Sequence, residues 1–347
     1  MINRKRLADA IRGKKVLVTG GTGSFGHQIV KSLLAFEPAS IGIYSRDEKK
    51  QYDMRQEYAD QRRMDFLLGD VRDAARTSEV FRGVDVVFHA AAMKQVPNSE
   101  DAPWEAVKTN IVGAENVRRA AIENGVGAVI AISTDKAVKP VNVMGMTKSL
   151  QERIIMSPSG AESGTKFMCV RYGNVLGSRG SVIPLFRKQV LAGQPLTITH
   201  PGMSRFLLTL PEAVELVLWA TVEGRNGDLW VRKMPAANVV DLAKTVAYGL
   251  TGDEDYPHRI IGTRAGEKLH EVLVSEEEMW RAQEMDQHYL IPAWWKSEQQ
   301  QSSTGEDLPE YASNTFPLLS REKLYGLLSD DGWFEGASTL KPFRAAA

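Results

Sequence analysis

The chain has 347 residues, of which 43% are hydrophobic and 25% are charged, as in ordinary globular proteins. Lys and Arg together number 43, as do Asp and Glu, so the formal net charge is zero. A protein that binds nucleic acid through its phosphates usually carries a basic excess, so this balance argues against nucleic acid as the principal partner. No stretch reaches the roughly 18 apolar residues of a membrane span. No apolar signal core follows the basic N-terminus. These features predict a cytoplasmic protein with no membrane span.

The number and spacing of the cysteine and histidine residues do not predict a metal site. The single cysteine, Cys169, excludes an internal disulfide and any cluster with several cysteine ligands. It lies in the apolar run 167–170, which predicts a small buried side chain. The six histidines show no ligand spacing such as HxxxH, and His89 lies in an apolar segment that predicts a core position.

Apolar, β-branched segments alternate with helix-like segments through the first half of the chain. The predicted strands cover residues 15–19, 40–44, 65–68, 84–89, 128–133 and 167–171. The predicted helices between them lie near 24–36, 47–61, 73–81, 101–123 and 143–157. Because the strands are almost continuously hydrophobic, both faces of their sheet must be covered. The alternation predicts an α/β fold, a doubly wound parallel sheet of the Rossmann type.

Beyond residue 176 the elements become shorter and more mixed. Strands are predicted at 196–199 and 206–208, with a helix near 211–223. The predicted division is a sheet domain at 1–176, to which about 205–235 return, and a smaller α+β substrate-binding lobe at 177–204 and 236–330. Residues 331–347 form a C-terminal tail, and the polar stretch 296–310 predicts a solvated loop.

The first predicted strand runs directly into a glycine-rich loop, residues 19–26 (TGGTGSFG). Glycines permit a tight turn and a close approach of backbone N–H groups to a pyrophosphate, and the following helix N-terminus favours negative charge. In the first strand–helix turn of an alternating pattern, this loop predicts that residues 1–176 bind a dinucleotide; a purely structural turn would not need three spaced glycines. The glycines have GxxGxxG spacing rather than GxGxxG, and the predicted loop contacts are Gly20, Thr22, Gly23, Ser24, Phe25 and Gly26.

The residues after the second strand favour NADP over NAD. An NAD site usually places an acidic residue there, against the ribose 2′-hydroxyl, whereas this chain has Ser45, Arg46 and Lys49. A hydroxyl, a guanidinium and an ammonium can hold a 2′-phosphate, and Arg does so bidentately. Asp47 keeps NAD open, and the alternative is that Arg46 and Lys49 are ordinary exposed charges. Asp70, after the third strand, is a candidate for contact with the adenine amino group.

The motifs resemble a known superfamily. The glycine loop, Gly69-Asp70-Val71-Arg72-Asp73, His89-Ala90-Ala91-Ala92 and Asn110 are similar to the extended short-chain dehydrogenase/reductases. Segments 93–97 (MKQVP), 133–137 (STDKA), 171–175 (RYGNV) and 178–184 (SRGSVIP) resemble, more specifically, the inverting UDP-N-acetylglucosamine 4,6-dehydratases. The similarity covers about residues 13–275. It implies a UDP-sugar substrate, a homo-oligomer (dimer or hexamer), and cofactor contacts from Val71, Ala90, Ala91, Ala92 and Asn110.

The Tyr-x-x-x-Lys pair of that superfamily is incomplete here. The corresponding run is Met144-Gly145-Met146-Thr147-Lys148, and none of the nine tyrosines is followed by Lys four residues later. In the superfamily the Tyr is the acid/base at the oxidised hydroxyl, and the Lys holds the nicotinamide ribose. A thioether has no titratable proton, so Met144 performs no acid–base catalysis. Dehydratases that make L-configured deoxy sugars for capsules and O-antigens resemble the chain even here, with Met in the Tyr position, which favours an active enzyme.

The resemblance implies a dehydration with a tightly bound NADP that is recycled in each turnover. Oxidation at sugar C4 acidifies C5, a base removes the C5 proton, an acid assists loss of the C6 hydroxyl, and C5 is protonated on the opposite face. Asp135 and Lys136, at the carboxyl end of the fifth strand, are assigned as the C6 acid and the C5 base. Thr134 is assigned to orient the C4 hydroxyl. The acceptor of the C4 proton is left open between Lys136 and a water relay, and the alternative for the pair is a salt-bridged surface loop.

The second lobe supplies binding groups. Arg205 and Arg264 are predicted to clamp a diphosphate, a task that suits planar guanidinium groups. Asn174 reaches the same group, Glu267 accepts hydrogen bonds from a ribose diol, and Lys94 contacts the sugar. The other residues that the motif matches assign to the substrate are Met144, Arg179, Val182 and Thr197.

The favoured function is a UDP-N-acetylglucosamine 4,6-dehydratase with C5 inversion. Its product is a UDP-2-acetamido-2,6-dideoxy-L-hexos-4-ulose for bacterial surface polysaccharide or glycan synthesis. The alternatives are a nucleotide-sugar C4 or C5 epimerase, and a non-catalytic NADP-binding regulatory protein suggested by Met144. Asp135 and Lys136 argue against the regulatory protein, because a binding module needs no acid/base pair. The sugar configuration and the nucleotide base stay open.

Overall fold

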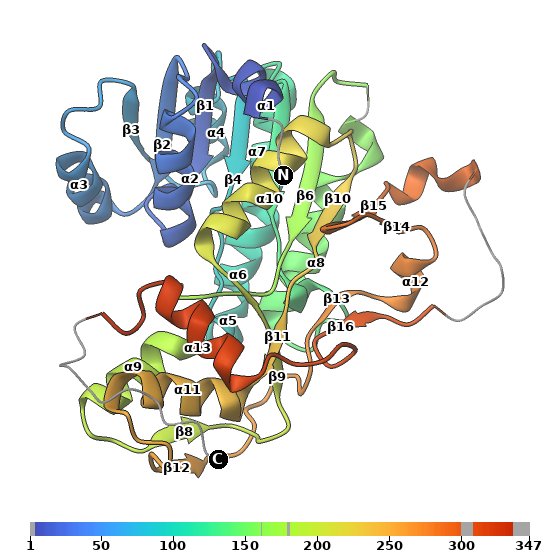
Figure 1. Ribbon diagram of the computed structural model, residues 1–347. Helices are drawn as coiled ribbons and strands as arrows, with labels where there is room; N and C mark the ends of the chain where they lie inside the picture. The colour runs from blue at the N-terminus through green and yellow to red at the C-terminus, as the bar shows by residue number, and fades with distance from the viewer. Residues whose placement is uncertain (1–3, 161, 179–180, 300–307, 336–347) are drawn as a thin grey trace. The chain divides into compact units, whose positions relative to one another are not determined.

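The computed structural model describes residues 4–160, 162–178, 181–299 and 308–335. The chain forms two compact units (Figure 1). The first combines Met1–Tyr172, Pro211–Lys233 and Leu273–Glu310, and the second combines Gly173–Leu210, Met234–Val272 and Tyr311–Ala347. In the described part of the chain, no helix is both long and apolar enough to cross a membrane.

The first unit is built on a nine-stranded sheet in the order β14-β15-β10-β6-β5-β4-β1-β2-β3. In that order the strands are Gln283–Glu284, His288–Ile291, Leu229–Arg232, Lys166–Arg171, Ala128–Ile132, Val86–His89, Lys15–Thr19, Ser40–Ser45 and Met64–Leu68. Pairing is parallel from β10 to β3 and antiparallel where β15 joins β10 and β14. The chain order reverses on either side of β1, where open α/β sheets bind ligands. The predicted α/β fold is confirmed, and each of the six predicted strands matches a strand here to within two residues at either end.

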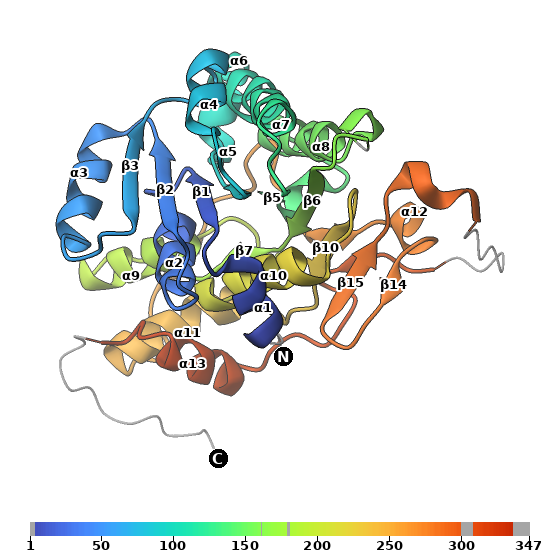
Figure 2. The same ribbon diagram turned by 90° about the horizontal axis from the view of Figure 1, so that it is seen from above.

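Helices cover both faces of this sheet (Figure 2). Those of the first unit are α1 Arg4–Ile11, α2 Ser24–Leu34, α3 Glu48–Glu57, α4 Ala74–Val80, α5 Val96–Asp101, α6 Pro103–Ala106, α7 Gly113–Glu123, α8 Val143–Ile155, α10 Leu210–Glu223 and α12 Glu276–Met279. In Figure 2, α4, α7 and α8 lie along one face, and α2 and α10 lie along the other. With both faces covered, the central strands keep buried apolar side chains on both sides, and Cys169 and His89 are buried as predicted.

The single helix expected near 101–123 is interrupted. A π-helical segment, η1 (Val107–Val112), separates α6 from α7. A π turn holds one more residue than an α turn, and such turns often occur at functional sites. Hydrophobic periodicity alone does not distinguish the two kinds of turn, and the extra residue here places Asn110 in the interior.

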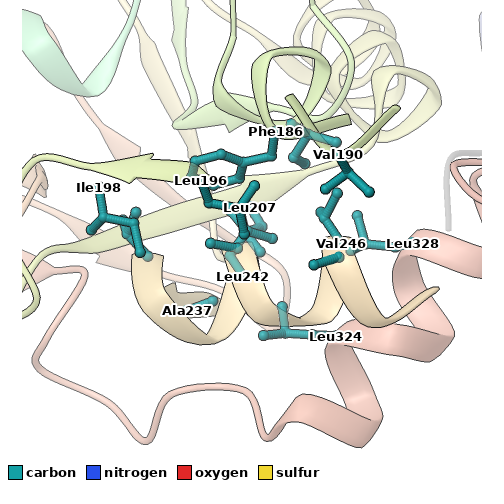
Figure 3. Close-up of a cluster of buried hydrophobic side chains, with 14 of the residues drawn as sticks. Phe186, Val190, Leu196, Ile198, Leu207, Ala237, Leu242, Val246, Leu324 and Leu328 are labelled. Carbon is teal, nitrogen blue, oxygen red and sulfur yellow. The ribbon is translucent and has the colours of Figure 1, made fainter. Parts of the chain in front are cut away.

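Where it is described, the second unit contains small sheets packed with helices α9, α11 and α13. Its elements are β7 Asn174–Val175, α9 Val182–Leu191, β8 Leu196–Ile198, β9 Ser204–Leu208, β11 Ala236–Asn238, α11 Val239–Thr251, β12 His258–Ile260 and α13 Arg321–Asp330. Strands β13 (Val272–Val274) and β16 (Tyr311–Ala312) lie where the chain passes from one unit to the other. Figure 3 shows the core, in which apolar side chains of α9, β8, β9, α11 and α13 meet. Burial of these side chains accounts for the stability of the unit.

The division differs from the expected one in residues 273–310, which we expected in the smaller lobe. The structure places them in the first unit, because β15 pairs with β10 and β14 pairs with β15. The returning segment runs over 211–233, close to the expected 205–235. The expected loop at 296–310 starts within a 3₁₀ helix, η4 (Trp294–Gln299), and its residues 300–307 lie outside the described residues, as does most of the 331–347 tail.

Candidate active site

The glycine-rich loop joins β1 to α2 and fits closely against the chain that follows β4. Gly20 has φ +69°, and a Cβ there would lie 2.8 Å from the backbone nitrogen of Ala91. A Cβ at Gly26 would lie 2.1 Å from the carbonyl oxygen of Gly21. Any side chain at these two positions would force the loop away from β4 or α2. This arrangement is the close approach that a dinucleotide site requires.

The N-terminus of α2 is free of a side-chain cap. Its N-cap residue, Gly23, makes no side-chain hydrogen bond, and the first helical bond runs from the His27 nitrogen to the Gly23 oxygen. The N–H groups at Ser24 and Phe25 therefore remain available to an anion at the positive end of the helix dipole. Thr22 is turned away from this end, because its hydroxyl donates to Ser45 Oγ at 3.2 Å. The loop thus fits the pyrophosphate of a dinucleotide.

The structure brings Ser45, Arg46 and Asp70 together. Arg46 Nη1 lies 3.7 Å from Asp70 Oδ2, and the Arg46 side chain is 58% exposed, so it can reach a ligand. Burial raises the pKa of Asp70, but hydrogen bonds from Arg72 outweigh burial, and the pKa lies below its ordinary value. Lys49 is directed elsewhere: it pairs with Asp53 at 2.7 Å along α3, and its side chain is 82% exposed.

Asn110 is a positioning residue for the segment after β4. Its Oδ1 accepts from the backbone N–H of Met93 at 2.8 Å, and its Nδ2 donates to the Met93 carbonyl at 3.0 Å. The same Nδ2 donates to Thr147 Oγ1 at 2.9 Å, which links α8 to this segment. Residues 90–92 precede Met93 directly and are half-buried. Asn110 therefore holds the chain that was predicted to contact the cofactor. On the neighbouring side, the Val71 carbonyl accepts from Asn116 Nδ2 at 2.9 Å.

Asp135 and Lys136 form a tight pair at the end of β5, in the 3₁₀ turn η2 (Asp135–Ala137). Asp135 is fully buried, and its Oδ1 accepts from Lys136 Nζ at 2.9 Å and from Thr134 Oγ1 at 2.8 Å. Its Oδ2 is buried and has no hydrogen-bond partner among the described residues, and neither has Ser133 Oγ. Buried polar atoms without partners are rare, and at the carboxyl end of a strand they point to a bound ligand.

The first two turns of α8 lie against this pair. Lys148 is buried, and its Nζ donates to the Ile132 carbonyl and to Gln151 Oε1, the latter at 2.8 Å. Burial lowers the pKa of Lys148 to about 8. Met144 is 4% exposed and precedes Lys148 by four residues, so both lie on one face of the helix.

Gly145 is a site residue that the sequence analysis missed. A Cβ at this position would lie 2.2 Å from the carbonyl oxygen of Lys136. The backbone of α8 therefore touches η2, and this contact sets the distance between Met144 and Lys136. A lone glycine after a methionine gives no sequence signal for such a contact, because only the fold brings α8 against η2.

In the second unit, Arg205 is engaged with its own chain. Its guanidinium donates to the carbonyls of Ser204 at 2.7 Å, Lys268 at 3.0 Å and Leu269 at 3.2 Å. Arg264 is exposed on the loop that also contains Lys268 and Leu269. Its backbone N–H donates to Glu267 Oε2 at 3.0 Å, which closes a turn. In this geometry Arg205 holds the loop that presents Arg264.

The remaining predicted substrate residues differ in their surroundings. The Thr197 hydroxyl already has a partner within the chain, because it accepts a hydrogen bond from Gln189 Nε2 at 2.8 Å. Asn174 Oδ1 is buried without a partner in the described chain. Val182 is the first residue of α9, and Lys94 is exposed after β4. Arg179 lies outside the described residues. Among the residues that the structure describes, no three or more His, Cys, Asp or Glu side chains gather as a metal site.

Comparison with known proteins identifies the family. Residues 16–293 match the family model described as "Polysaccharide biosynthesis protein". The chain belongs to this family. The UDP-glucose 4-epimerases of Rickettsia canadensis and Rickettsia akari are each 48% identical over 285 residues, which cover 80% of this chain and 83% of theirs.

Solved structures agree with this assignment. Pen from Bacillus thuringiensis superimposes with a TM-score of 0.87 at 36% identity, covering 93% of this chain and 99% of that one. DesIV, a dTDP-glucose 4,6-dehydratase from Streptomyces venezuelae, has a TM-score of 0.67 at 22% identity, covering 74% and 86%, and so shares the fold. The resemblance to the extended short-chain dehydrogenase/reductases is confirmed. This member of the polysaccharide biosynthesis protein family is an enzyme of the nucleotide-sugar dehydratase and epimerase group.

Proposed function

We propose that this enzyme is a UDP-N-acetylglucosamine 4,6-dehydratase that inverts C5. The observation that carries the proposal is the buried Asp135 carboxylate, bonded to Lys136 Nζ at 2.9 Å, with its second oxygen unpartnered in the described chain. Elimination of water needs a base at C5 and an acid at the C6 hydroxyl, whereas exchange of configuration at C4 needs only a group that takes and returns the C4 hydroxyl proton. The pair supplies both, and Met144 replaces the residue that acts on the C4 hydroxyl in the superfamily.

The chain's own residues divide the work as follows. A bound nicotinamide cofactor supplies oxidation at C4 and reduction at C6. Lys136 removes the C5 proton and is 22% exposed, so it can reach a sugar. Asp135 protonates the departing C6 hydroxyl, and its bond to Lys136 lets the proton taken from C5 return to the carboxylate. A solvent water then delivers a proton to the opposite face of C5, while the proton released from the C4 hydroxyl leaves to solvent. Thr134 orients the C4 hydroxyl, and the C4 proton passes to Lys136 or to a water held by Ser133.

NADP is the proposed cofactor, held tightly and recycled. The exposed Arg46 guanidinium beside Ser45 supports this choice, because it can bind a 2′-phosphate bidentately. Asp47 keeps NAD open as the alternative, and the DesIV structure contains NAD. Lys148 and the uncapped end of α2 hold the ribose and the pyrophosphate with either cofactor.

A nucleotide-sugar 4-epimerase is the second candidate, since the Rickettsia relatives carry that name. Both reactions share a transient 4-keto sugar, but only the dehydratase loses the C6 hydroxyl.

The deciding experiment incubates the enzyme with UDP-N-acetylglucosamine, and separately with UDP-glucose, in heavy water and follows the products by NMR. A dehydratase gives a C6 methyl group with deuterium at C5. An epimerase gives the C4 epimer with its C6 hydroxyl intact, and unchanged substrate refutes both. Lys136→Ala abolishes elimination under the proposal. Met144→Leu, a control of similar volume on the neighbouring helix α8, keeps a substantial fraction of turnover.

A further inference from the structure

A cavity of about 320 Å³ lies within the first unit and contains none of the residues assigned above to the cofactor or the substrate. Its walls come from the second half of α8, the segment after η2, α12 and the chain following β15, elements that can be followed in Figure 2. Its volume is at the lower end of the range for small-molecule sites. Its lining includes seven charged side chains: Lys139, Arg153, Arg171 and Arg281 lie with Glu152, Glu277 and Glu278.

Two of the three carboxylates, those of Glu152 and Glu278, form ion pairs with Arg171. Its Nε and Nη2 donate to Glu152 at 2.8 and 2.7 Å, and its Nη1 and Nη2 donate to Glu278 at 2.7 and 2.8 Å. All three side chains are at most 12% exposed. This fork-to-fork geometry uses nearly all the acceptor capacity of the two carboxylates. The third, Glu277, is exposed and accepts from Ser275 Oγ at 2.7 Å.

The remaining two guanidinium groups make no ion pair in the described part of the chain, although the Glu278 carboxylate acts on Arg281 from a distance. Within the described residues neither Arg153 nor Arg281 has an acidic group at ion-pair distance. Arg281 is half-buried, and its Nε is enclosed without a hydrogen-bond partner. Arg153 stacks on the Trp294 ring, 4.6 Å from its centroid. Lys139, by contrast, is neutralised by Glu276 and Glu310. Arg153 is exposed, whereas Arg281 is partly desolvated, and a desolvated cation without an ion pair is costly, so the cavity favours a negatively charged occupant beside Arg281.

We propose that this cavity binds a small molecule carrying a phosphate or carboxylate group, held between Arg281 and Arg153. The planar guanidinium suits either anion, since both offer paired oxygens. The Trp294 ring, already stacked with Arg153, supplies an apolar wall for the rest of the ligand.

The test is isothermal titration calorimetry on the full chain, with inorganic pyrophosphate and citrate as separate probes. At least one probe binds the wild type, and Arg281→Gln weakens that binding at least tenfold. Arg153→Gln weakens it as well. The matched control is Arg264→Gln in the second unit, which leaves the same binding event in place. Preference for pyrophosphate identifies a phosphate site, and preference for citrate identifies a carboxylate site.

Thermal unfolding provides a readout that does not depend on heats of binding. Without anion, Arg281→Gln melts at or above the wild-type midpoint, because it removes an unpaired cation and breaks no ion pair. The probe raises the wild-type midpoint but not that of the variant. The proposal is overturned if neither probe binds the wild type, if Arg281→Gln binds as tightly as the wild type, or if Arg264→Gln removes all binding.

Discussion

Replacing Lys148 by Met removes a buried ammonium group from the candidate active site. Burial lowers the pKa of this lysine from 10.5 to about 8. Below pH 8 the lysine is protonated in both the folded and the unfolded chain, so the full cost of burying the charge opposes folding. Between pH 8 and 10.5 the folded state releases the proton while the unfolded state keeps it, and the wild type gains stability as pH rises.

The size of this gain follows from the pKa difference. A shift from 10.5 to about 8 corresponds to about 3 kcal/mol at roughly 1.4 kcal/mol per pH unit. Met does not titrate, so Lys148→Met gains nothing over this interval. The variant does lose the hydrogen bonds to Ile132 and Gln151, a cost of about 1–3 kcal/mol that varies little with pH. The unfolding free energy of the variant minus that of the wild type therefore falls by about 3 kcal/mol between pH 8 and 10.5.

Urea unfolding of both proteins across this interval, without added cofactor, measures the difference directly. Lys31→Met, at an exposed position of α2, is the matched control and should show a nearly constant difference from the wild type. A constant difference for Lys148→Met as well would refute the reasoning, because it would mean that the folded state keeps the lysine protonated at no cost.

Other substitutions test further parts of the structure. Arg171→Met leaves Glu152 and Glu278 buried without their partner and should cost about 3–5 kcal/mol in urea unfolding; a loss below about 1 kcal/mol would contradict a strong network. Gly145→Ala places a Cβ 2.2 Å from the Lys136 carbonyl and should lower kcat by about a hundredfold with cofactor still bound. Unchanged kcat would show that α8 can move without disturbing the pair. Arg46→Ala should weaken NADP binding about ten- to a hundredfold and NAD binding little, as measured by titration. Equal weakening of both would exclude a 2′-phosphate contact.

Local sequence patterns were sufficient for six strands of the large sheet and for the glycine-rich loop. Strands β1 to β6 are short apolar runs between helix-like segments, and all but the edge strand β3 are buried on both faces, so each strand is visible in the sequence without knowledge of its neighbours. The glycine loop is equally local, since the turn and the start of α2 follow it directly along the chain. The pairing of Asp135 with Lys136 could also be anticipated, because the two residues are adjacent at the end of a predicted strand.

Contacts between distant segments were decided by the tertiary structure alone. The π turn at Asn110 depends on hydrogen bonds to Met93 and Thr147, which the amide can make only once β4 and α8 are in place. Gly145 is required because the backbone of α8 meets the Lys136 carbonyl. Residues 273–310 join the first unit by β pairing with β10, a register that short mixed strands do not reveal in isolation. The unpaired Arg281 follows from the same docking, since the bond between Arg171 and Glu278 takes up the carboxylate that Arg281 would otherwise share.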